Sequence, residues 1–393
     1  MQLLAAVGWD GNDQMYPIAY AVVEAETKEA WIWFLRLLFG DIGSPNHHKW
    51  CFISDQQKGL LPAFKEVAPT VEHRFCVRHL HSNFSKLHKG KQLKDAMWDA
   101  AKATTVVDWK REMQKIKDID KAAYTYLMAL QPNWWTRSAF STFCKCDALL
   151  NNMCESFNGY ILEAREKPII KMLEMVREAL MMRMQEKREF IKNVKGPICP
   201  NIQSKLEKLK IKCRKCLPTW CGQRIYEVKC FPDKFIVDLD ARSCSCRKWD
   251  LTGIPCIHAI SGICHANEKL EDYVNEVYTV ETYKRTYEHM IHPVASEKFW
   301  PDTGRPVVHP PSQRRPTGRP KKLRRREPDE PRDSYRVSKK RVQMRCSKCH
   351  QYGHNRTSCK GQVAAKKGKG MGNAPAKKKG QAVEGGKNKG GLH

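Results

Sequence analysis

The sequence contains no uninterrupted apolar run of the length that a membrane-spanning helix needs, and residues 1–7 show neither a charged leader nor a cleavage site. Acidic residues are scarce as well, with 42 Asp and Glu against 70 Lys and Arg. The lack of a long apolar run predicts a chain with no membrane partner. The lack of a charged leader and a cleavage site predicts that there is no signal peptide. We therefore expect its seventeen cysteines to be thiols and zinc ligands in a reducing compartment.

The net charge of +28 is concentrated at one end of the chain. Residues 301–393 hold 26 Lys and Arg against 6 Asp and Glu, a balance of +20, which leaves +8 for the first 300 residues. A basic tail on a nearly balanced body favours a polyanion as partner, most simply nucleic acid. A solubilising tail or a nuclear-import signal is the alternative, and either is compatible with binding.

The first part of the chain predicts a hairpin, a helix, a strand, a helix and a strand. The hairpin has strands at 3–7 and 18–23, and Thr27 is expected to cap a buried helix through residue 39. The apolar run 50–53 predicts a strand buried on both faces, directly followed by Asp55. This carboxylate either N-caps the next helix or belongs to a site at the carboxyl end of the strand. The order of elements resembles ribonuclease H-like folds without their first strand.

The remaining chain divides at composition changes. Residues 83–143 show helical apolar stripes, residues 151–158 open another helix, and a long helix follows Pro168. Gly196-Pro197 and Pro200 mark a boundary, and strands are expected at 225–228 and 234–239. After residue 300 the chain becomes rich in Pro, Arg and Lys, and residues 361–393 have the composition of a disordered segment.

The strongest metal motif combines two short cysteine-containing pairs. Three thiolates and one imidazole complete a tetrahedral zinc shell and leave no open position, which predicts a structural site. The ligands are Cys244, Cys246, Cys256 and His258. We expect Cys264 and His265, which follow in the same helix, not to bind metal.

A second motif has the spacing of a zinc knuckle, a compact module that contacts single-stranded nucleic acid and needs its metal to fold. Its ligands are Cys346, Cys349, His354 and Cys359, so the sequence predicts two structural zinc sites in all. Knuckles also bind proteins, so only zinc binding follows directly from the spacing. Between the two motifs, Arg319, Lys321 and Lys322 lie in a Gly-Arg-Pro segment that resembles an AT-hook, for which a basic linker or import signal is an equal alternative.

Other thiols have less definite interpretations. Cys76 and His79 are either half of a metal site or a core thiol beside a helix-cap histidine. Cys213, Cys216 and Cys221 have no matching Cys or His pair nearby in sequence and stay unassigned.

In combination, these segments resemble plant Mutator-like (MuDR-type) transposases. The resemblance rests on the hairpin at 3–19, the strand and turn at 52–60, the Cys-x2-His motif at 76–79 and the helix start at 151–158. The cysteines and histidine at 244–258 are similar to a SWIM-type zinc finger, and the knuckle is a frequent C-terminal addition. The similarity covers roughly residues 1–360.

The resemblance implies a ribonuclease H-like core whose Asp-Asp-Glu set holds two Mg²⁺ ions for attack on a phosphodiester. Asp55 corresponds to the second acid and Glu155 to the third. The first acid lies on a strand before the hairpin, and the chain begins after that strand. Asp10 and Asp13 belong at the other end of the hairpin and are poor substitutes. We therefore expect the two acids to be vestigial and Mg²⁺ to bind only if the core were complete.

The expected organisation is a mixed α/β chain of several parts. A partial ribonuclease H-like core (1–84 and 146–196) holds a helical insertion (85–145), and a SWIM-type region (200–300), a basic linker (301–340), a knuckle (341–362) and a basic tail (363–393) follow. Three functions are compatible with it: a nuclear zinc- and DNA-binding protein that cannot cleave, an active transposase, or an RNA-binding adaptor. The DNA partner would be terminal repeats or A·T-rich sequence, and oligomerisation is compatible with each reading.

Overall fold

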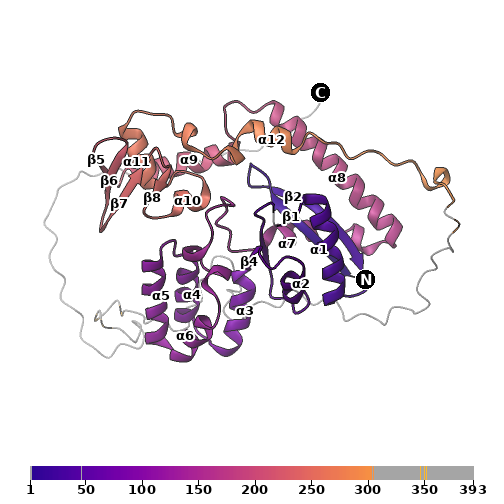
Figure 1. The fold of residues 1–393 in the computed structure, drawn as a ribbon, viewed down its shortest axis with the longest axis horizontal. Coiled ribbons are helices and arrows are strands. Elements are labelled where there is room, and N and C mark those ends of the chain that lie inside the picture. The colour runs from indigo at the N-terminus through magenta and orange to yellow at the C-terminus, as the bar shows by residue number, and fades with distance from the viewer. Residues whose placement is uncertain are drawn as a thin grey trace, which may run out of the picture. The chain divides into compact units, whose positions relative to one another are not determined.

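The computed structural model describes residues 2–45, 47–302, 304, 346, 349 and 351 of the 393-residue chain. The chain forms two compact units, residues 1–325 and 326–393. All helices and strands named below belong to the first unit (Figure 1). The AT-hook-like segment, the basic tail and the knuckle residues His354 and Cys359 lie outside the described residues.

The first part of the chain folds in the predicted order of elements. Thr27 caps the first helix, because its hydroxyl accepts a hydrogen bond from the Ala30 N–H at 3.2 Å. The elements are β1 (Gln2–Trp9), β2 (Met15–Val23), α1 (Lys28–Ile42), β3 (Cys51–Ser54), α2 (Leu60–Val67) and β4 (Glu72–Phe75). β1 pairs with β2 in an antiparallel hairpin, and β3 pairs with β4 in parallel. The two pairs are separate sheets.

Two burial predictions for this part are wrong. Helix α1 is not buried all round, because Trp33 and Leu37 point away from the core on its outer face and are about half exposed. Strand β3 is not buried on both faces, since all four of its residues are only partly covered. The reason is that one edge of β3 faces a cavity.

A helical layer follows, and it starts earlier than residue 83, at Val77. Its helices are α3 (Val77–Leu87), α4 (Lys91–Lys102), α5 (Val106–Ile119) and α6 (Lys121–Met128), followed by the short turns η1 (Pro132–Trp134) and η2 (Arg137–Ala139). Thr105 caps α5, because its hydroxyl accepts a hydrogen bond from the Asp108 N–H at 3.1 Å. The apolar stripes of these helices meet in one core with Trp135 at 0% exposure.

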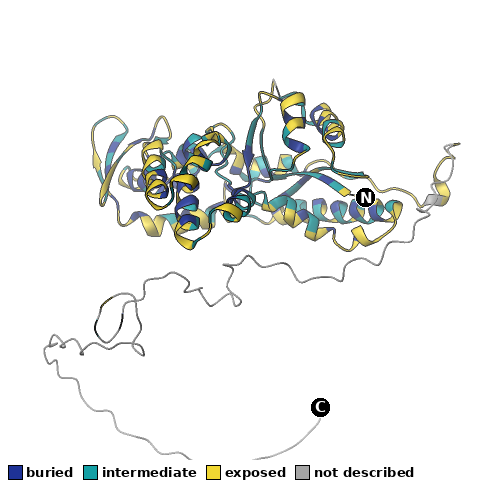
Figure 2. Cartoon of the chain, turned by 90° about the horizontal axis from the view of Figure 1, so that it is seen from below, coloured by how far each residue is buried: buried dark blue, intermediate teal, exposed yellow. Residues whose placement is uncertain are grey.

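Two helices cover the hairpin. They are α7 (Asn152–Tyr160) and, after the turn η3 (Ala164–Glu166), α8 (Ile169–Lys192). The buried residues of α8 recur every fourth position from Met172 to Met184, which is the period of one helix face, and its other side is exposed (Figure 2). Leu3, Ala5 and Val7 of β1 pack in the same cluster.

The last part of the first unit is built around a four-stranded antiparallel sheet in the order β5-β6-β7-β8. Its elements are α9 (Pro200–Cys213), β5 (Leu217–Trp220), β6 (Ile225–Cys230), β7 (Asp233–Asp238), β8 (Ser243–Cys244), α10 (Lys248–Thr252), α11 (Ile257–His265), η4 (Leu270–Tyr273), η5 (Glu276–Tyr278), α12 (Val280–Thr286) and η6 (Glu297–Phe299). β6 and β7 are the two predicted strands, and β5 and β8 extend the sheet on either side. None of the described helices has the length and apolarity to cross a membrane.

Candidate carboxylate and zinc sites

Asp55 immediately follows β3, and its carboxylate is half-buried. Within the described part of the chain, its carboxylate has no hydrogen-bond or ion-pair partner. The cap of α2 is provided by Gln57 instead, whose Oε1 accepts hydrogen bonds from the N–H groups of Gly59 at 2.6 Å and Leu60 at 2.8 Å. The alternative in which Asp55 N-caps the helix is therefore wrong, and its carboxylate is available for another role.

Glu155 lies in the first turn of α7 and is held by an ion pair. Its Oε2 is 2.7 Å from Nη1 of Arg78, in the first turn of α3. Both side chains are more than 40% exposed, so the pair contributes little to stability. The ion pair instead fixes the position of Glu155, because it holds this side chain next to the segment that follows β4.

Asp55 and Glu155, far apart in sequence, both lie near enough to His79 for their charges to act on its ring. The hydrogen bond with Cys76 is the main cause that raises the pKa of His79, and the negative charges of Asp55 and Glu155 raise it further. Burial raises the pKa of the neighbouring Cys154 thiol to about 11, and the Asp55 charge contributes again. Both carboxylates line the same cavity. The two predicted acids therefore line one cavity and act on the same two neighbours, His79 and Cys154.

A third carboxylate near this place was missed by the sequence analysis. Burial raises the pKa of Glu26, and the charge of Asp55 raises it further, so the two carboxylates interact. Glu26 precedes α1, in a segment with no motif around it. Only the closure of the chain around the cavity brings it to Asp55.

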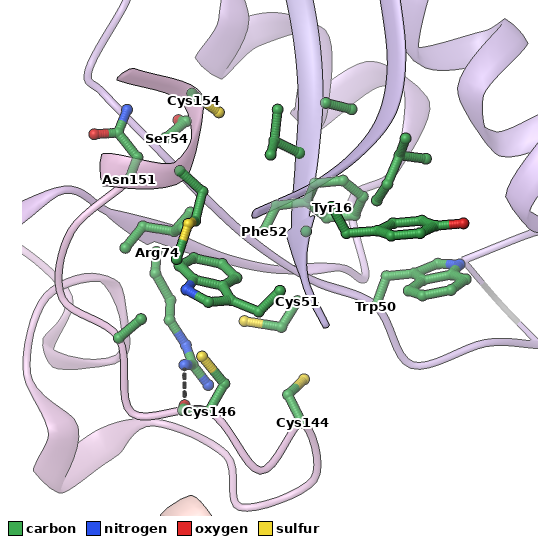
Figure 3. A pocket seen from close by; sticks show the side chains of 18 of the residues that line it. Tyr16, Trp50, Cys51, Phe52, Ser54, Arg74, Cys144, Cys146, Asn151 and Cys154 are labelled. Carbon is green, nitrogen blue, oxygen red and sulfur yellow. Dashed lines mark hydrogen bonds between the residues drawn. The ribbon is translucent and has the colours of Figure 1, made fainter. Parts of the chain in front are cut away.

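Two buried polar atoms near the carboxylates have no hydrogen-bond partner among the described residues: Nδ1 of His79 and Oδ1 of Asn151. Both residues line the cavity, and Asn151 lies at the start of α7 near Ser54 and Cys154 (Figure 3). Carboxylate and amide oxygens are the donors that Mg²⁺ prefers, so Asp55, Glu155 and Asn151 fit that ion in kind, whereas the nitrogen of His79 does not. In the described part of the chain, however, the carboxylates of Asp55 and Glu155 do not converge with a third ligand into one coordination sphere.

Asp10 and Asp13 lie at the turn of the hairpin, as the sequence analysis expects. The Asp10 carboxylate accepts hydrogen bonds from the N–H groups of Asn12 and Gln14, at 2.9 and 2.8 Å, and from the Tyr287 hydroxyl at 2.7 Å. Asp13 is paired with Lys205. Both acids therefore have structural partners at the turn.

Cys76 and His79 lie close together at the start of α3, and each shifts the pKa of the other. Burial raises the pKa of Cys76, but hydrogen bonds from His79 and from the Asn151 N–H outweigh this effect and lower it. Neither residue belongs to any of the convergent metal-ligand sets found among the described residues. The geometry favours the core thiol beside a helix-start histidine over half of a metal site.

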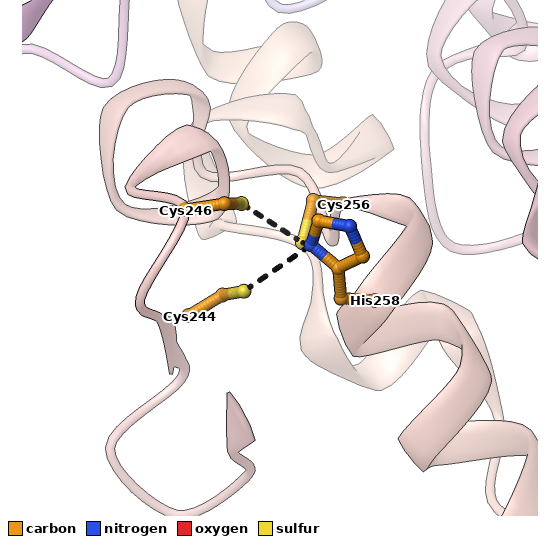
Figure 4. Close-up of side chains that lie close together, drawn as sticks. All are labelled: Cys244, Cys246, Cys256 and His258. Atoms are coloured by element: carbon orange, nitrogen blue, oxygen red, sulfur yellow. Dashed lines mark hydrogen bonds between the residues drawn. The ribbon is translucent and has the colours of Figure 1, made fainter. Parts of the chain in front are cut away.

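The four predicted zinc ligands of the finger converge in a buried cluster (Figure 4). Nδ1 of His258 lies 3.6 Å from Sγ of Cys244 and 3.8 Å from Sγ of Cys256, and the sulfurs of Cys246 and Cys256 are 3.6 Å apart. Ligands at Zn–S and Zn–N bond lengths of about 2.3 and 2.0 Å in a tetrahedron are separated by about 3.5–3.8 Å. The cluster therefore has the size and donor set of a closed zinc site.

Local backbone geometry presents these ligands. Arg247 and Gly253 adopt left-handed conformations, with φ of 59° and 68°, which turn the chain after the first pair and before the second. Cys256 occupies the N-cap of α11, where its sulfur accepts a hydrogen bond from the Ala259 N–H at 3.5 Å. Hydrogen bonds from Cys244 and Cys256 lower the pKa of the Cys246 thiol, which favours the thiolate that a metal needs.

A second thiol pair near the finger was also missed. Sulfurs of Cys216 and Cys230 lie within 4.8 Å of each other and of a ring nitrogen of His258. Cys216 follows α9 and Cys230 ends β6, so their spacing in sequence carries no ligand signal. Only the pairing of β5 with β6 brings them to the histidine, whose ring also stacks on Phe235 at a centroid distance of 3.8 Å.

Of the knuckle, Cys346, Cys349 and Gln351 are described. The N–H of Cys346 donates to the carbonyl of Gln351 at 2.8 Å. The other two predicted ligands fall outside the described residues, so the knuckle stays a prediction.

Comparison with known proteins gives two matches. Residues 1–83 match the MULE transposase domain, and residues 226–261 match the SWIM zinc finger. A search of curated proteins finds no match to the chain. The first match contains Asp55 and His79, and the second contains all four ligands of the buried cluster. Together they support a transposase-derived, zinc-binding protein.

Proposed function

We propose that the chain is a nuclear DNA-binding protein derived from a Mutator-like transposase of the MuDR type, and that it does not cleave DNA by itself. In this proposal the first part is a ribonuclease H-like core with a helical insertion. The finger and the C-terminal knuckle each hold a structural zinc ion. The observation that carries the proposal is that the charges of Asp55 and Glu155 both act on His79, within and beside the segment that matches a transposase domain.

The absence of cleavage is proposed from the number of acids that can reach one metal pair. Two-metal phosphodiester cleavage needs several carboxylates in one coordination sphere. Asp10 and Asp13 have structural partners at the hairpin turn. Asp55 and Glu155 alone would bind a pair of Mg²⁺ ions weakly.

DNA as partner is supported by charge and by the type of module. The +20 balance of residues 301–393 favours a polyanion, and the SWIM and transposase matches favour nucleic acid in general. An AT-hook-like segment around Arg319 favours A·T-rich duplexes. The knuckle favours single-stranded RNA instead, which makes an RNA-binding adaptor the competing hypothesis.

The test is fluorescence anisotropy of the full, zinc-loaded chain with three probes of equal length: an A·T-rich duplex, a G·C-rich duplex and a single-stranded RNA. We expect the A·T-rich duplex to bind at least about tenfold more tightly than the RNA at the same salt concentration. Arg319→Ala should remove the preference between the two duplexes, whereas Lys387→Ala, in the tail, should leave it intact. Tighter binding of the RNA would replace this function with the adaptor.

A second candidate is a Mg²⁺-dependent nuclease, favoured by Glu26. Its carboxylate interacts with Asp55 at the end of the cavity where His79 and Asn151 have unpartnered polar atoms. Bound Mg²⁺ would supply an activated water and charge stabilisation of the leaving oxygen. Asp55, Glu155 and Glu26 would hold the ion, with the Asn151 amide oxygen as a further donor. If Glu26→Gln abolishes Mg²⁺-dependent nicking, the metal site includes Glu26. If nicking persists in this variant, Asp55 and Glu155 hold the metal without it.

A further inference from the structure

Cys216 and Cys230 form a pair of thiols beside the finger but outside its four-ligand cluster. Their sulfurs lie within 4.8 Å of each other. Neither cysteine is in a disulfide, and Cys216 is buried whereas Cys230 is half-buried. The segment that matches the finger spans residues 226–261 and leaves out Cys216, so the pair is not part of that motif.

The register of β5 and β6 places the two cysteines opposite each other. Leu217 is paired with Lys229 in this antiparallel ladder, and one further step along the same register sets Cys216 against Cys230. Residues directly opposite in an antiparallel pair have Cα atoms about 4.5–5.5 Å apart. A disulfide needs a Cα separation of about 4.4–6.8 Å. The ladder therefore gives the backbone spacing that a disulfide requires.

A metal ion is the other partner that two adjacent thiols could share. The third donor of this set is a ring nitrogen of His258, within 4.8 Å of both sulfurs. That imidazole already belongs to the finger, because its Nδ1 lies 3.6 Å from Sγ of Cys244. Two thiols without the histidine do not complete the four-ligand shell of a structural zinc ion. Oxidative coupling is the chemistry that this leaves to the pair.

Two other cysteines of this region are less suited as partners. The Cys213 sulfur, in the last turn of α9, donates a hydrogen bond to the Lys210 carbonyl at 3.0 Å. Cys221 is exposed and follows the other end of β5. Neither belongs to a set of converging ligand atoms in the described part of the chain.

We propose that Cys216 and Cys230 are a redox modification site, which forms a reversible disulfide between β5 and β6 while the finger keeps its zinc. The oxidant is a low-molecular-weight disulfide such as oxidised glutathione. In the reducing compartment expected for this chain, the bond forms only when that reagent accumulates. The inference does not depend on DNA binding.

The reaction proceeds by two thiol–disulfide exchanges. The Cys230 sulfur, the more accessible of the two, attacks one sulfur of the reagent, whose S–S bond breaks as a mixed disulfide forms. The released glutathione takes the Cys230 proton. Cys216 then attacks the Cys230 sulfur, and the second glutathione leaves with the Cys216 proton. The two protein thiols lose two electrons, and the reagent gains them as two thiols.

The bridge would fasten the outer strand of the sheet. β5 is an edge strand, since in the described part of the chain it pairs with β6 alone. A covalent link next to its first residue, Leu217, opposes local opening of the strand from that end. We therefore expect the modification to change the dynamics of β5 more than those of the central strands.

The test is treatment of the full, zinc-loaded chain with oxidised glutathione, followed by alkylation of the remaining thiols and mass mapping of non-reduced tryptic peptides. Cleavage after Lys215, Arg224 and Lys229 puts the two cysteines on separate peptides. We expect a cross-link between these peptides at unchanged zinc content. Amide exchange in β5 should slow by at least about tenfold, with no change in α5, and dithiothreitol should reverse both effects.

Two variants locate the bridge. Cys230→Ser should abolish the cross-link and the slowing, with zinc content equal to that of the wild type as the check that the finger has folded. Cys221→Ser removes the other thiol of the Cys216 peptide and should leave both effects intact. If Cys230→Ser fails to fold, the wild type and Cys221→Ser still decide the question.

Four results would overturn the proposal. The first is a mixed disulfide at Cys230 with no cross-link, and the second is a cross-link made by Cys213 or Cys221 instead. The third is a cross-link that forms only after zinc has left, because the pair would then need an unfolded finger. The fourth is an additional equivalent of zinc that is lost in Cys230→Ser, which would assign the pair to a metal.

Discussion

At the scale of single residues, the zinc cluster depends on four side chains that are each less than 10% exposed. In a metal-free state their burial would leave three thiols and an imidazole without the ion that matches their geometry. The neighbouring Cys264, about two helix turns after Cys256 in the same helix, is exposed and belongs to neither convergent set. We therefore expect Cys256 to bind zinc and Cys264, in the same helix, not to bind it.

We expect Cys256→Ser to remove one equivalent of zinc and to lower the free energy of unfolding by about 4 kcal/mol or more, because the finger loses its metal. Cys264→Ser should change neither quantity. Zinc content by elemental analysis and urea unfolding of the purified variants measure both. Full zinc retention in Cys256→Ser would refute the assignment of this ligand.

His73 of β4 shows how a buried histidine couples stability to pH. Its ring lies 4.3 Å from that of Phe64, and burial lowers its pKa to about 4. The Ser54 hydroxyl donates to the Asp55 carbonyl at 2.8 Å, so its oxygen accepts the hydrogen bond from Nε2 of His73 at 2.7 Å. The folded protein thus holds a neutral imidazole with the proton on Nε2.

Because the unfolded chain takes up this proton near pH 6.5 and the folded chain only near pH 4, stability is complete above about pH 6.5 and falls as the pH drops toward 4. At pH 5 we expect the wild type to have lost about 2 kcal/mol from this residue. His73→Phe should flatten this part of the urea-unfolding pH profile, while His47→Gln, at an exposed position, should not. A profile identical to the wild type in His73→Phe would show that another group titrates.

At the scale of elements, the finger is joined to the helical layer through Arg247, directly after the ligand Cys246. Its guanidinium donates to the carbonyl oxygens of Thr104 at 3.1 Å, of Arg137 at 3.2 Å and of Phe140 at 2.7 Å, and also to that of Ser138. The Thr104 hydroxyl donates in return to the Cys246 carbonyl at 2.7 Å. These bonds satisfy the carbonyl groups at the ends of α4 and η2.

Removing this guanidinium should uncouple the two parts. We expect Arg247→Met to cost about 3 kcal/mol, because several buried carbonyls lose a charged donor, and to split urea unfolding into two transitions. Lys248→Met, at the exposed next position, serves as the control and should keep one transition. A single, unshifted transition in Arg247→Met would mean that the contacts between these elements do not depend on the arginine.

The elements also show which features could be predicted from the sequence. The hairpin, β3, β6 and β7, the helix cap at Thr27 and the four finger ligands follow from local spacing, and the structure agrees with them. Glu26 beside Asp55, and Cys216 and Cys230 beside His258, could not be predicted. Glu26 reaches Asp55 because the chain folds around the cavity, and Cys216 and Cys230 reach His258 because β5 pairs with β6. In both cases the segments that meet share no sequence motif. The partial exposure of β3 depends on an unpaired edge, which no local pattern encodes.

At the scale of the whole molecule, the proposed function combines a zinc-bound finger, a basic C-terminal region and two carboxylates at one end of a cavity. The finger and the basic C-terminal region would bind DNA, and cleavage of DNA would need the two carboxylates. The finger and the carboxylates can be tested separately, because they belong to different parts of the first unit. The decisive question is whether the carboxylates do chemistry.

The most direct measurement is nicking of supercoiled plasmid by the full, zinc-loaded chain in Mg²⁺, compared with Asp55→Ala. We predict that the wild type nicks no faster than the variant, because Asp55 and Glu155 lack enough partners to hold a metal pair. Asp13→Ala, which removes the ion pair between the hairpin turn and Lys205, controls for a contaminating nuclease. Mg²⁺-dependent nicking by the wild type and by Asp13→Ala that disappears in Asp55→Ala would contradict the account and establish an active enzyme.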